Sequence, residues 1–141
     1  MTSDRTQAYI DEFRANEGRL GGNFEGVPVL LLHDRDAASG DERVTPLTCQ
    51  PLATEGQPPA AWAVFASSGG APTDPAWYRN LLAHPDVTIE FGPDTFETTA
   101  RITAGEERDQ IWTRQKQLMP SFATYEEKAG REIPVVVLEP R

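Results

Sequence analysis

Six short runs of strand length, most of them separated by turns, constrain the fold of this chain more than any other feature. Apolar and β-branched residues dominate the runs, which is the pattern of buried strands. Residues 92–94, Gly-Pro-Asp, join two of the runs as a hairpin turn. Twelve prolines and eleven glycines imply many turns and favour a β-rich architecture over a helix bundle. The predicted strands cover residues 27–33, 43–52, 61–66, 87–91, 95–103 and 133–138.

Four helices accompany these strands without alternating regularly with them. We predict helices over residues 4–17, 75–83, 104–119 and 121–128. Asp74 and Ser121 are expected N-caps, Pro75 suits the first helical position, and Thr103 with Glu106 forms an expected capping box. This grouping favours an α+β fold around a small, mostly antiparallel β-barrel over a doubly wound sheet. The 141 residues have the length of a single domain, which we expect to span the whole chain.

The segment between the third predicted strand and the second predicted helix has the composition of a ligand-binding turn. Ser67, Ser68, Gly69 and Gly70 carry no bulky side chain, so a ligand could approach their backbone closely. The N–H groups of this turn and of the first turn of the helix could bind an anion such as phosphate or carboxylate. A tight strand-to-helix connection without a ligand is the alternative that the residues alone leave open.

Charge and composition exclude several classes of partner. Thirteen Lys and Arg against 22 Asp and Glu give a formal net charge of −9. Nucleic-acid binding depends on a basic surface, so we expect neither a nucleic-acid partner nor an anionic membrane partner. No apolar run reaches the roughly 18 residues that span a bilayer, and the N-terminus lacks the pattern of a signal peptide, so we expect a cytoplasmic protein. Cys49, the single cysteine, is expected to be a buried strand residue.

The usual signatures of metal-dependent and nucleophilic catalysis are missing from the sequence. It contains no HExxH motif, no GxSxG elbow and no P-loop. Its two histidines, His33 and His84, are expected at a strand end and a helix end, where structural roles are common. A chain without a strong acid, base or nucleophile suggests that a bound cofactor carries the reaction.

Several residues outside the turn could hold a flat, anionic ligand. Ser39 lies in a predicted loop, and Arg43, at the start of the next strand, could bind a phosphate in bidentate fashion. Trp77 and Asn80 are three residues apart on the second predicted helix, so they share a face that offers an apolar wall and an amide. Together with the turn, these residues predict a binding site for a negatively charged, planar molecule.

The order and spacing of several segments resemble those of the deazaflavin-dependent nitroreductase and quinone reductase family. The resemblance extends over nearly the whole chain from about residue 23 onward. The segments are residues 30–32 (LLL), 39–40 (SG), 43–47 (RVTPL), 66–72 (ASSGGAP), 75–81 (PAWYRNL), 84–87 (HPDV), 106–108 (EER), Pro120, Tyr125 and residues 131–140 (REIPVVVLEP).

This resemblance implies a fold, a cofactor and a reaction. Family members fold as split β-barrels and use the reduced 8-hydroxy-5-deazaflavin coenzyme F-420, so we expect a six-stranded split-barrel reductase. It would transfer a hydride to an electron-poor small molecule such as a quinone, an activated enone or lactone, or a nitroaromatic. The coenzyme site implied by the resemblance consists of Ser39, Arg43, Val44, Thr45, Pro46, Leu47, Ser67, Ser68, Gly69, Gly70, Ala76, Trp77 and Asn80.

The resemblance also assigns roles within this site. Ser39, Arg43 and the turn amides would serve the phosphate side of the coenzyme, and the ring would lie against Trp77 and the strand residues. Phe122 and Tyr125 occupy positions that the family places over the substrate pocket. Tyr125 would donate a proton to the substrate or orient it, and a ring that only walls the pocket is the alternative.

The chain departs from the family pattern at three places. Ala37 and Ala38 stand where basic residues usually precede Ser-Gly, Ser68 stands where a lysine often follows the serine of the turn, and Phe122 replaces a tyrosine of some members. Cations that could compensate are Arg35, Arg79 and Lys128. Otherwise coenzyme affinity is low or the cofactor differs. The alternatives are therefore an FMN-binding relative and a non-catalytic carrier or sensor of the deazaflavin, and the sequence predicts no oligomeric state.

Overall fold

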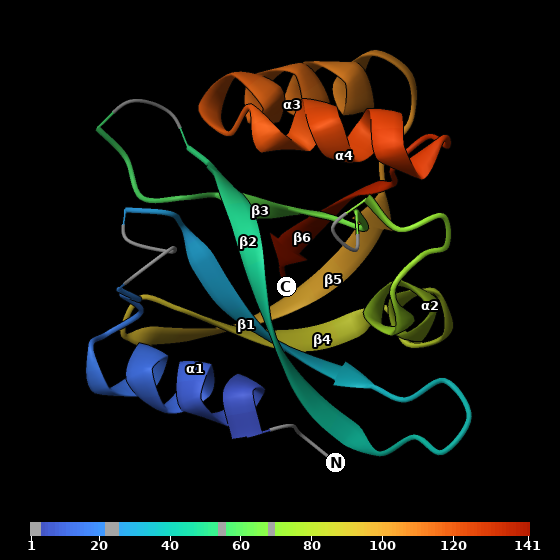
Figure 1. Cartoon of the computed structure of the whole chain (residues 1–141). Coiled ribbons are helices and arrows are strands. Elements are labelled where there is room, and N and C mark those ends of the chain that lie inside the picture. The colour runs from blue at the N-terminus through green and yellow to red at the C-terminus, as the bar shows by residue number, and fades with distance from the viewer. Residues whose placement is uncertain (1–3, 22–25, 54–55, 68–69) are drawn as a thin grey trace.

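The computed structural model of the chain describes residues 4–21, 26–53, 56–67 and 70–141. Within these residues, six strands close into a barrel in the order β1-β2-β3-β6-β5-β4 (Figure 1). Every neighbouring pair is antiparallel, which confirms the predicted α+β barrel. The strands are β1 (Val29–Arg35), β2 (Glu42–Leu52), β3 (Ala61–Phe65), β4 (Asp86–Phe91), β5 (Asp94–Ile102) and β6 (Val135–Pro140).

The helices cover the barrel from three directions. They are α1 (Asp4–Ala15), α2 (Ala76–Ala83), α3 (Gly105–Leu118) and α4 (Ser121–Ala129). Figure 1 shows α3 and α4 side by side on one side of the barrel, α1 on the opposite side, and α2 beside the start of β4. In the described ranges, none of these helices has the length and apolar character needed to cross a membrane.

Three apolar clusters follow from the alternation of side chains along the strands. Leu30 and Leu32 point into the barrel, whereas Leu31 points outward and packs with Ile10 and Phe13 of α1. A third cluster joins the outer face of β3 and β6 to α3 and α4. Its members include Trp112, which is 2% exposed. The barrel wall is therefore buried on both faces where helices cover it, which explains the apolar runs in the sequence.

The strand prediction for Cys49 is confirmed, and the starts of two strands are shifted by two residues. Cys49 is buried in β2, where desolvation raises the pKa of its thiol. β1 and β6 begin two residues later than predicted, each directly after a proline, Pro28 or Pro134. Each proline lacks an N–H for the ladder but still contributes a carbonyl, since Pro28 accepts from Cys49 and Pro134 accepts from Ala66.

The predicted helix caps are wrong, because the side chains of Thr103 and Asp74 bind other partners and Ser121 lies within its helix. The observed N-cap residues are Pro75 of α2, Ala104 of α3 and Pro120 of α4, and none caps through a side-chain hydrogen bond. The Thr103 hydroxyl donates to the carbonyl of Val135 (2.8 Å). The Asp74 carboxylate pairs with Arg131 (2.7 Å). Ser121 lies inside α4, since the preceding proline already has helical dihedral angles.

Candidate functional site

The second strand loses one of its neighbours partway along its length. Residues 42–48 of β2 pair with β1, from Glu42 opposite Arg35 to Thr48 opposite Val29. Pairing with β3 covers only residues 49–52. Among the strands of the described ranges, none pairs with the other edge of residues 42–48. β2 and the chain that leaves β3 therefore diverge, and this free edge is the split in the barrel.

Alternation determines which backbone groups face the free edge. The Cys49 N–H donates to the carbonyl of Pro28 (3.0 Å), so residue 49 and every second residue before it face β1. The main-chain groups of Val44, Pro46 and Thr48 consequently face the free edge. A proline is well tolerated there because it has no N–H to leave unpaired.

The side chains of the predicted segment 43–47 do not all share one face. Arg43, Thr45 and Leu47 lie on the face toward the barrel interior, where Leu47 packs on the inner core cluster. Val44 points the other way and packs against the α1 cluster. On that face, Val44 and Pro46 can therefore contribute only main-chain groups to a ligand.

A fully buried carboxylate connects three of the predicted site segments. Asp34, at the end of β1, is 0% exposed. It accepts a hydrogen bond from the Thr45 hydroxyl (2.9 Å) and another from the Asn80 amide nitrogen (2.7 Å). The amide oxygen of Asn80 accepts from the N–H of Ala37 (2.9 Å). β1, β2, α2 and the β1–β2 loop are thus held together by one buried network, hereafter the Asp34 network.

Sequence reasoning missed Asp34 and assigned a different role to Asn80. Asp34 continues the inward alternation of Leu30 and Leu32, which was the available signal for a buried carboxylate at the barrel end. Asn80 was expected to offer a free amide to the ligand, but both of its amide atoms are bonded within the protein. Trp77 was expected to wall the ligand, but its ring is 6% exposed and belongs to the inner core. Both side chains support the site from beneath.

The turn after β3 lies against helix α4. Gly70 has a φ of +89°, and its N–H donates to the carbonyl of Ser67 (2.9 Å). A Cβ on Gly70 would lie 3.1 Å from the Lys128 side chain and 3.2 Å from the Tyr125 Cα, so only glycine suits this position. The structure therefore brings the backbone of Tyr125 next to the turn. Ser68 and Gly69 lie outside the described residues.

The β1–β2 loop, which carries Ser39, is organised by a second carboxylate. Asp36 accepts hydrogen bonds from the N–H groups of Ser39 (2.9 Å) and Ala38 (3.0 Å). These bonds, aided by the charge of Arg43, lower the pKa of Asp36. The Ser39 hydroxyl accepts from the N–H of Asp41 (3.2 Å). An acidic group thus occupies donors that an anionic ligand could otherwise use.

The two aromatic residues predicted over the substrate differ in exposure. Phe122 is 5% exposed and packs in the outer cluster, with its ring 5.6 Å from that of Phe65. Tyr125 is partly buried, with its ring 5.2 Å from that of Phe122. Tyr125 therefore remains at the surface of the site, and Phe122 supports it from the core.

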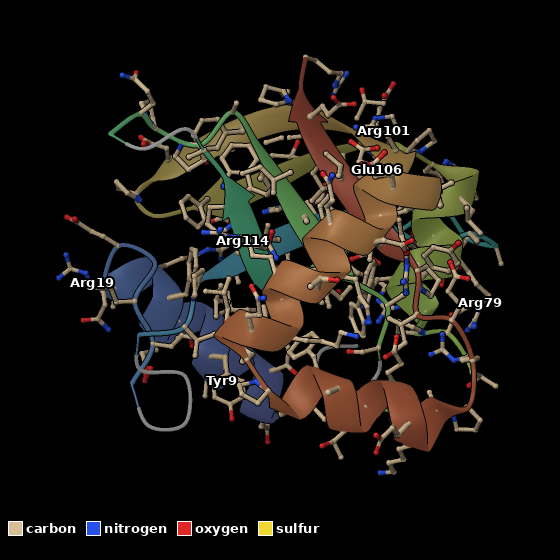
Figure 2. The ribbon with its side chains drawn as sticks, turned by 90° about the horizontal axis from the view of Figure 1, so that it is seen from above. Tyr9, Arg19, Arg79, Arg101, Glu106 and Arg114 are labelled. Carbon is tan, nitrogen blue, oxygen red and sulfur yellow. The ribbon has the colours of Figure 1, made fainter. Side chains whose placement is uncertain are left out.

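Two of the three candidate compensating cations are bonded to backbone oxygens. Arg35 donates to the carbonyl of Gly40 (3.2 Å), and Arg79 donates to that of Asp74 (3.0 Å). Figure 2 shows Arg79 at the periphery of the molecule. Lys128 is exposed, its stem lies on Gly70, and within the described residues its ammonium has no hydrogen bond or ion pair.

An antiparallel barrel opened along half of one strand, with a strand-turn-helix segment beside the opening, places the protein in the split β-barrel class. Within that class, the model of the F420H(2)-dependent quinone reductase family matches residues 5–140. The chain belongs to this family. Membership confirms the expected enzyme class, an oxidoreductase, and the expected cofactor, reduced coenzyme F-420, with a quinone as the acceptor.

Individual relatives agree with this membership. The chain is 37% identical over 133 residues to an F420H(2)-dependent quinone reductase of Mycobacterium tuberculosis (strain ATCC 25618 / H37Rv), an alignment covering 92% of this chain and 85% of the relative. A solved F420-H2 dependent reductase (FDR-A) superposes with a TM-score of 0.67 at 35% identity, covering 79% of this chain and 94% of that chain. A solved chain described as a domain-swapped dimer gives a TM-score of 0.69 at 31% identity, with 96% and 95% covered.

Proposed function

We propose that the protein binds reduced coenzyme F-420 along the free edge of β2 and reduces a quinone bound next to it. The observation that carries this placement is the unpaired half of β2 beside the chain that leaves β3. A planar ring could lie there without displacing a strand partner. The coenzyme supplies the hydride, and the residues of the chain bind it, orient it and exclude water.

Arg43 and Lys128 are the cations that we propose for the anionic side of the coenzyme. The Arg43 side chain is exposed, and none of the hydrogen bonds and ion pairs within the described residues involves it. Lys128 rises over Gly70, so its ammonium could reach an anion held by the turn. Lys128 would thus take the role of the lysine that many family members carry at the position of Ser68. Ser39, Ser67, Ser68, Gly69 and Gly70 complete this side of the proposal.

Thr45, Leu47 and the main chain of residues 44 and 46 are proposed for the ring side. The Thr45 hydroxyl proton is directed to Asp34, so the lone pairs of its oxygen remain free to accept an N–H from the ligand. At the start of α2, no side chain caps the helix, which leaves the N–H of Ala76 as a possible donor to the ligand.

Tyr125 is the proposed substrate-facing residue, and it would orient the acceptor or donate a proton to its oxygen. Phe122 would hold the Tyr125 ring in place. We extend the acceptor range from quinones to activated enones, lactones and nitroaromatics, because the chain itself needs to supply only position and a proton. The proposal treats residues 1–141 as one working domain in the cytoplasm, where the free, buried Cys49 suits a reducing environment.

The direct test is oxidation of the reduced coenzyme by the purified protein with a panel of quinones, enones and nitro compounds. We expect turnover with at least one quinone, and none when NADPH or reduced FMN replaces the coenzyme. A yellow protein that works with reduced FMN would overturn the cofactor assignment. If enones or nitro compounds were reduced but no quinone was, the assignment of a quinone as the acceptor would be overturned.

Arg43→Ala should weaken coenzyme binding several-fold, because one exposed charge-assisted contact to an anion is lost. Fluorescence titration of the oxidised coenzyme measures the change. Arg114→Ala removes the same charge from an exposed position on α3, which lies on the opposite side of the barrel from the start of β2 (Figure 1), and should leave the affinity unchanged. Equal affinity in the wild type and Arg43→Ala would remove Arg43 from the anionic side.

A non-catalytic carrier of the coenzyme is the second candidate function. Its ground is the proton donor: if the Tyr125 ring only walls the pocket, the chain would bind the coenzyme without the proposed donor for reduction. Tight coenzyme binding without turnover across the whole acceptor panel would favour this function over the reductase.

A further inference from the structure

Arg131 attaches the segment between β3 and α2 to the rest of the protein. It follows Gly130, the left-handed C-cap of α4, and its side chain is 18% exposed. The guanidinium makes four hydrogen bonds, and all of them go to residues 66–74. The bonds are Nη2 to the carbonyl of Ala66 (3.0 Å), Nη2 to that of Thr73 (3.1 Å), Nε to that of Ala71 (3.2 Å) and Nη1 to the carboxylate of Asp74 (2.7 Å).

Few backbone bonds could replace this contact. Among the described residues of the segment, the N–H of Ala66 donates to Pro134, and the N–H of Gly70 donates to Ser67. Neither bond reaches residues 71–74. Only a guanidinium has enough donors, in a rigid planar arrangement, to bond three carbonyls and a carboxylate at once.

We propose that Arg131 is a positioning residue for coenzyme binding, a role that rests on the proposed function. It would hold the turn at Ser67 and Gly70 and the start of α2 in the arrangement that receives the ligand. Its own charge is paired with Asp74, so it does not serve as an anion ligand. A segment that is ordered before binding loses less conformational freedom on binding, and this raises affinity without any direct contact.

The control for this proposal is an arginine with similar contacts elsewhere. Arg101 on β5 bonds Glu107 (2.6 Å and 2.9 Å) and Glu139 (2.9 Å). Figure 2 shows it near Glu106 at the start of α3, apart from Arg79 on α2. Arg101→Ala therefore removes the same charge and a comparable number of bonds away from the segment.

The experiment compares the wild type with Arg131→Ala, Arg131→Lys and Arg101→Ala at a temperature where all remain folded. For Arg131→Ala we expect about a tenfold rise in the coenzyme Kd and in the KM for the reduced coenzyme, because the segment must order on binding. We expect kcat and the quinone KM to change little, and amide exchange at residues 70–74 to quicken in the free protein. Arg131→Lys should restore part of the affinity, and Arg101→Ala should match the wild type.

Should Arg131→Ala fail to fold, Asp74→Ala removes one of the four bonds and should raise Kd about threefold. The proposal is overturned if Kd stays unchanged while exchange quickens, or if Arg101→Ala weakens binding equally. A wild type that binds no coenzyme overturns the proposed function itself, and the positioning role falls with it. Faster exchange at residues 70–74 would then still identify Arg131 as a purely structural residue.

Discussion

On one side of the proposed site, the buried carboxylate of Asp34 joins β1, β2 and α2 from inside the barrel. On the other side, the guanidinium of Arg131 and the contact of Gly70 with α4 hold an irregular segment near the surface. The first support is part of the core: Asp34 and Asn80 are buried, so the amide nitrogen of Asn80 cannot bond water instead if the carboxylate is removed. The second lies where water can replace a lost partner. We therefore expect damage on the Asp34 side to reduce stability first, and damage on the Arg131 side to reduce ligand affinity first.

Asp34→Ala should have the largest effect on stability. It leaves the Thr45 hydroxyl and the Asn80 amide nitrogen without their buried acceptor, which we expect to cost about 2–4 kcal/mol of unfolding free energy. Urea denaturation followed by tryptophan fluorescence measures this. Asp36→Ala, two residues along in the exposed loop, is the matched control and should lose much less. Equal losses would mean that the Asp34 network adds no more stability than a surface loop.

Gly70→Ala should be the strongest single test of the other side. Alanine must adopt a φ near +89° and push its Cβ toward Tyr125 and Lys128, so we expect a loss of about 1–2 kcal/mol. Coenzyme Kd should rise as well, because the turn and α4 must move apart. Gly56→Ala imposes a similar φ of +78° with nothing within 4 Å, so it should lose stability from strain alone and leave Kd unchanged. Similar coenzyme Kd values in Gly70→Ala and Gly56→Ala would show that the contact of Gly70 with α4 does not contribute to ligand binding.

Asp36→Asn, in the β1–β2 loop, should increase the affinity for the coenzyme. The amide oxygen can still accept from Ser39 and Ala38, while the negative charge near Arg43 is removed. We expect the Kd for the anionic coenzyme to fall about twofold to threefold at low salt, and the gain to shrink as salt screens the charge. A weaker affinity in Asp36→Asn would show that the ionised carboxylate is needed for the loop conformation.

Elements with strong periodicity could be predicted, and contacts that depend on tertiary structure could not. The six strands followed from short apolar runs, because a barrel wall covered by helices must be apolar on both faces. The role of Asn80 could not be deduced, because its partner Asp34 is 46 residues away and meets it only when the barrel closes. The failed cap at Asp74 has the same cause, since Arg131 takes that carboxylate. Local rules gave the elements, and non-local partners decided how the polar side chains within the site are used.

The ion pair between α1 and β4 lies outside both sides of the site. As an exposed polar contact, it should contribute less to stability than either support. Arg14 makes two hydrogen bonds to Glu90 (2.8 Å and 3.1 Å), and these are the main reason that the pKa of Glu90 lies below its usual value of 4.5. His33 also contacts Glu90 (2.7 Å) and adds to the lowering.

A carboxyl group with a lowered pKa in the folded state stabilises the protein above its unfolded pKa, near 4.5, and loses this contribution as the pH falls through its folded pKa. Arg14→Ala should therefore reduce the unfolding free energy by about 0.5–1 kcal/mol at neutral pH, with the difference from the wild type shrinking below pH 4.5. Arg19→Ala, which removes the same charge nearby, should show no such pH-dependent difference. If the loss of unfolding free energy in Arg14→Ala stayed unchanged down to about pH 3, the contribution of Arg14 would come from side-chain packing and not from its charge. This pair could then no longer serve as the exposed polar contact with which the buried Asp34 network is compared.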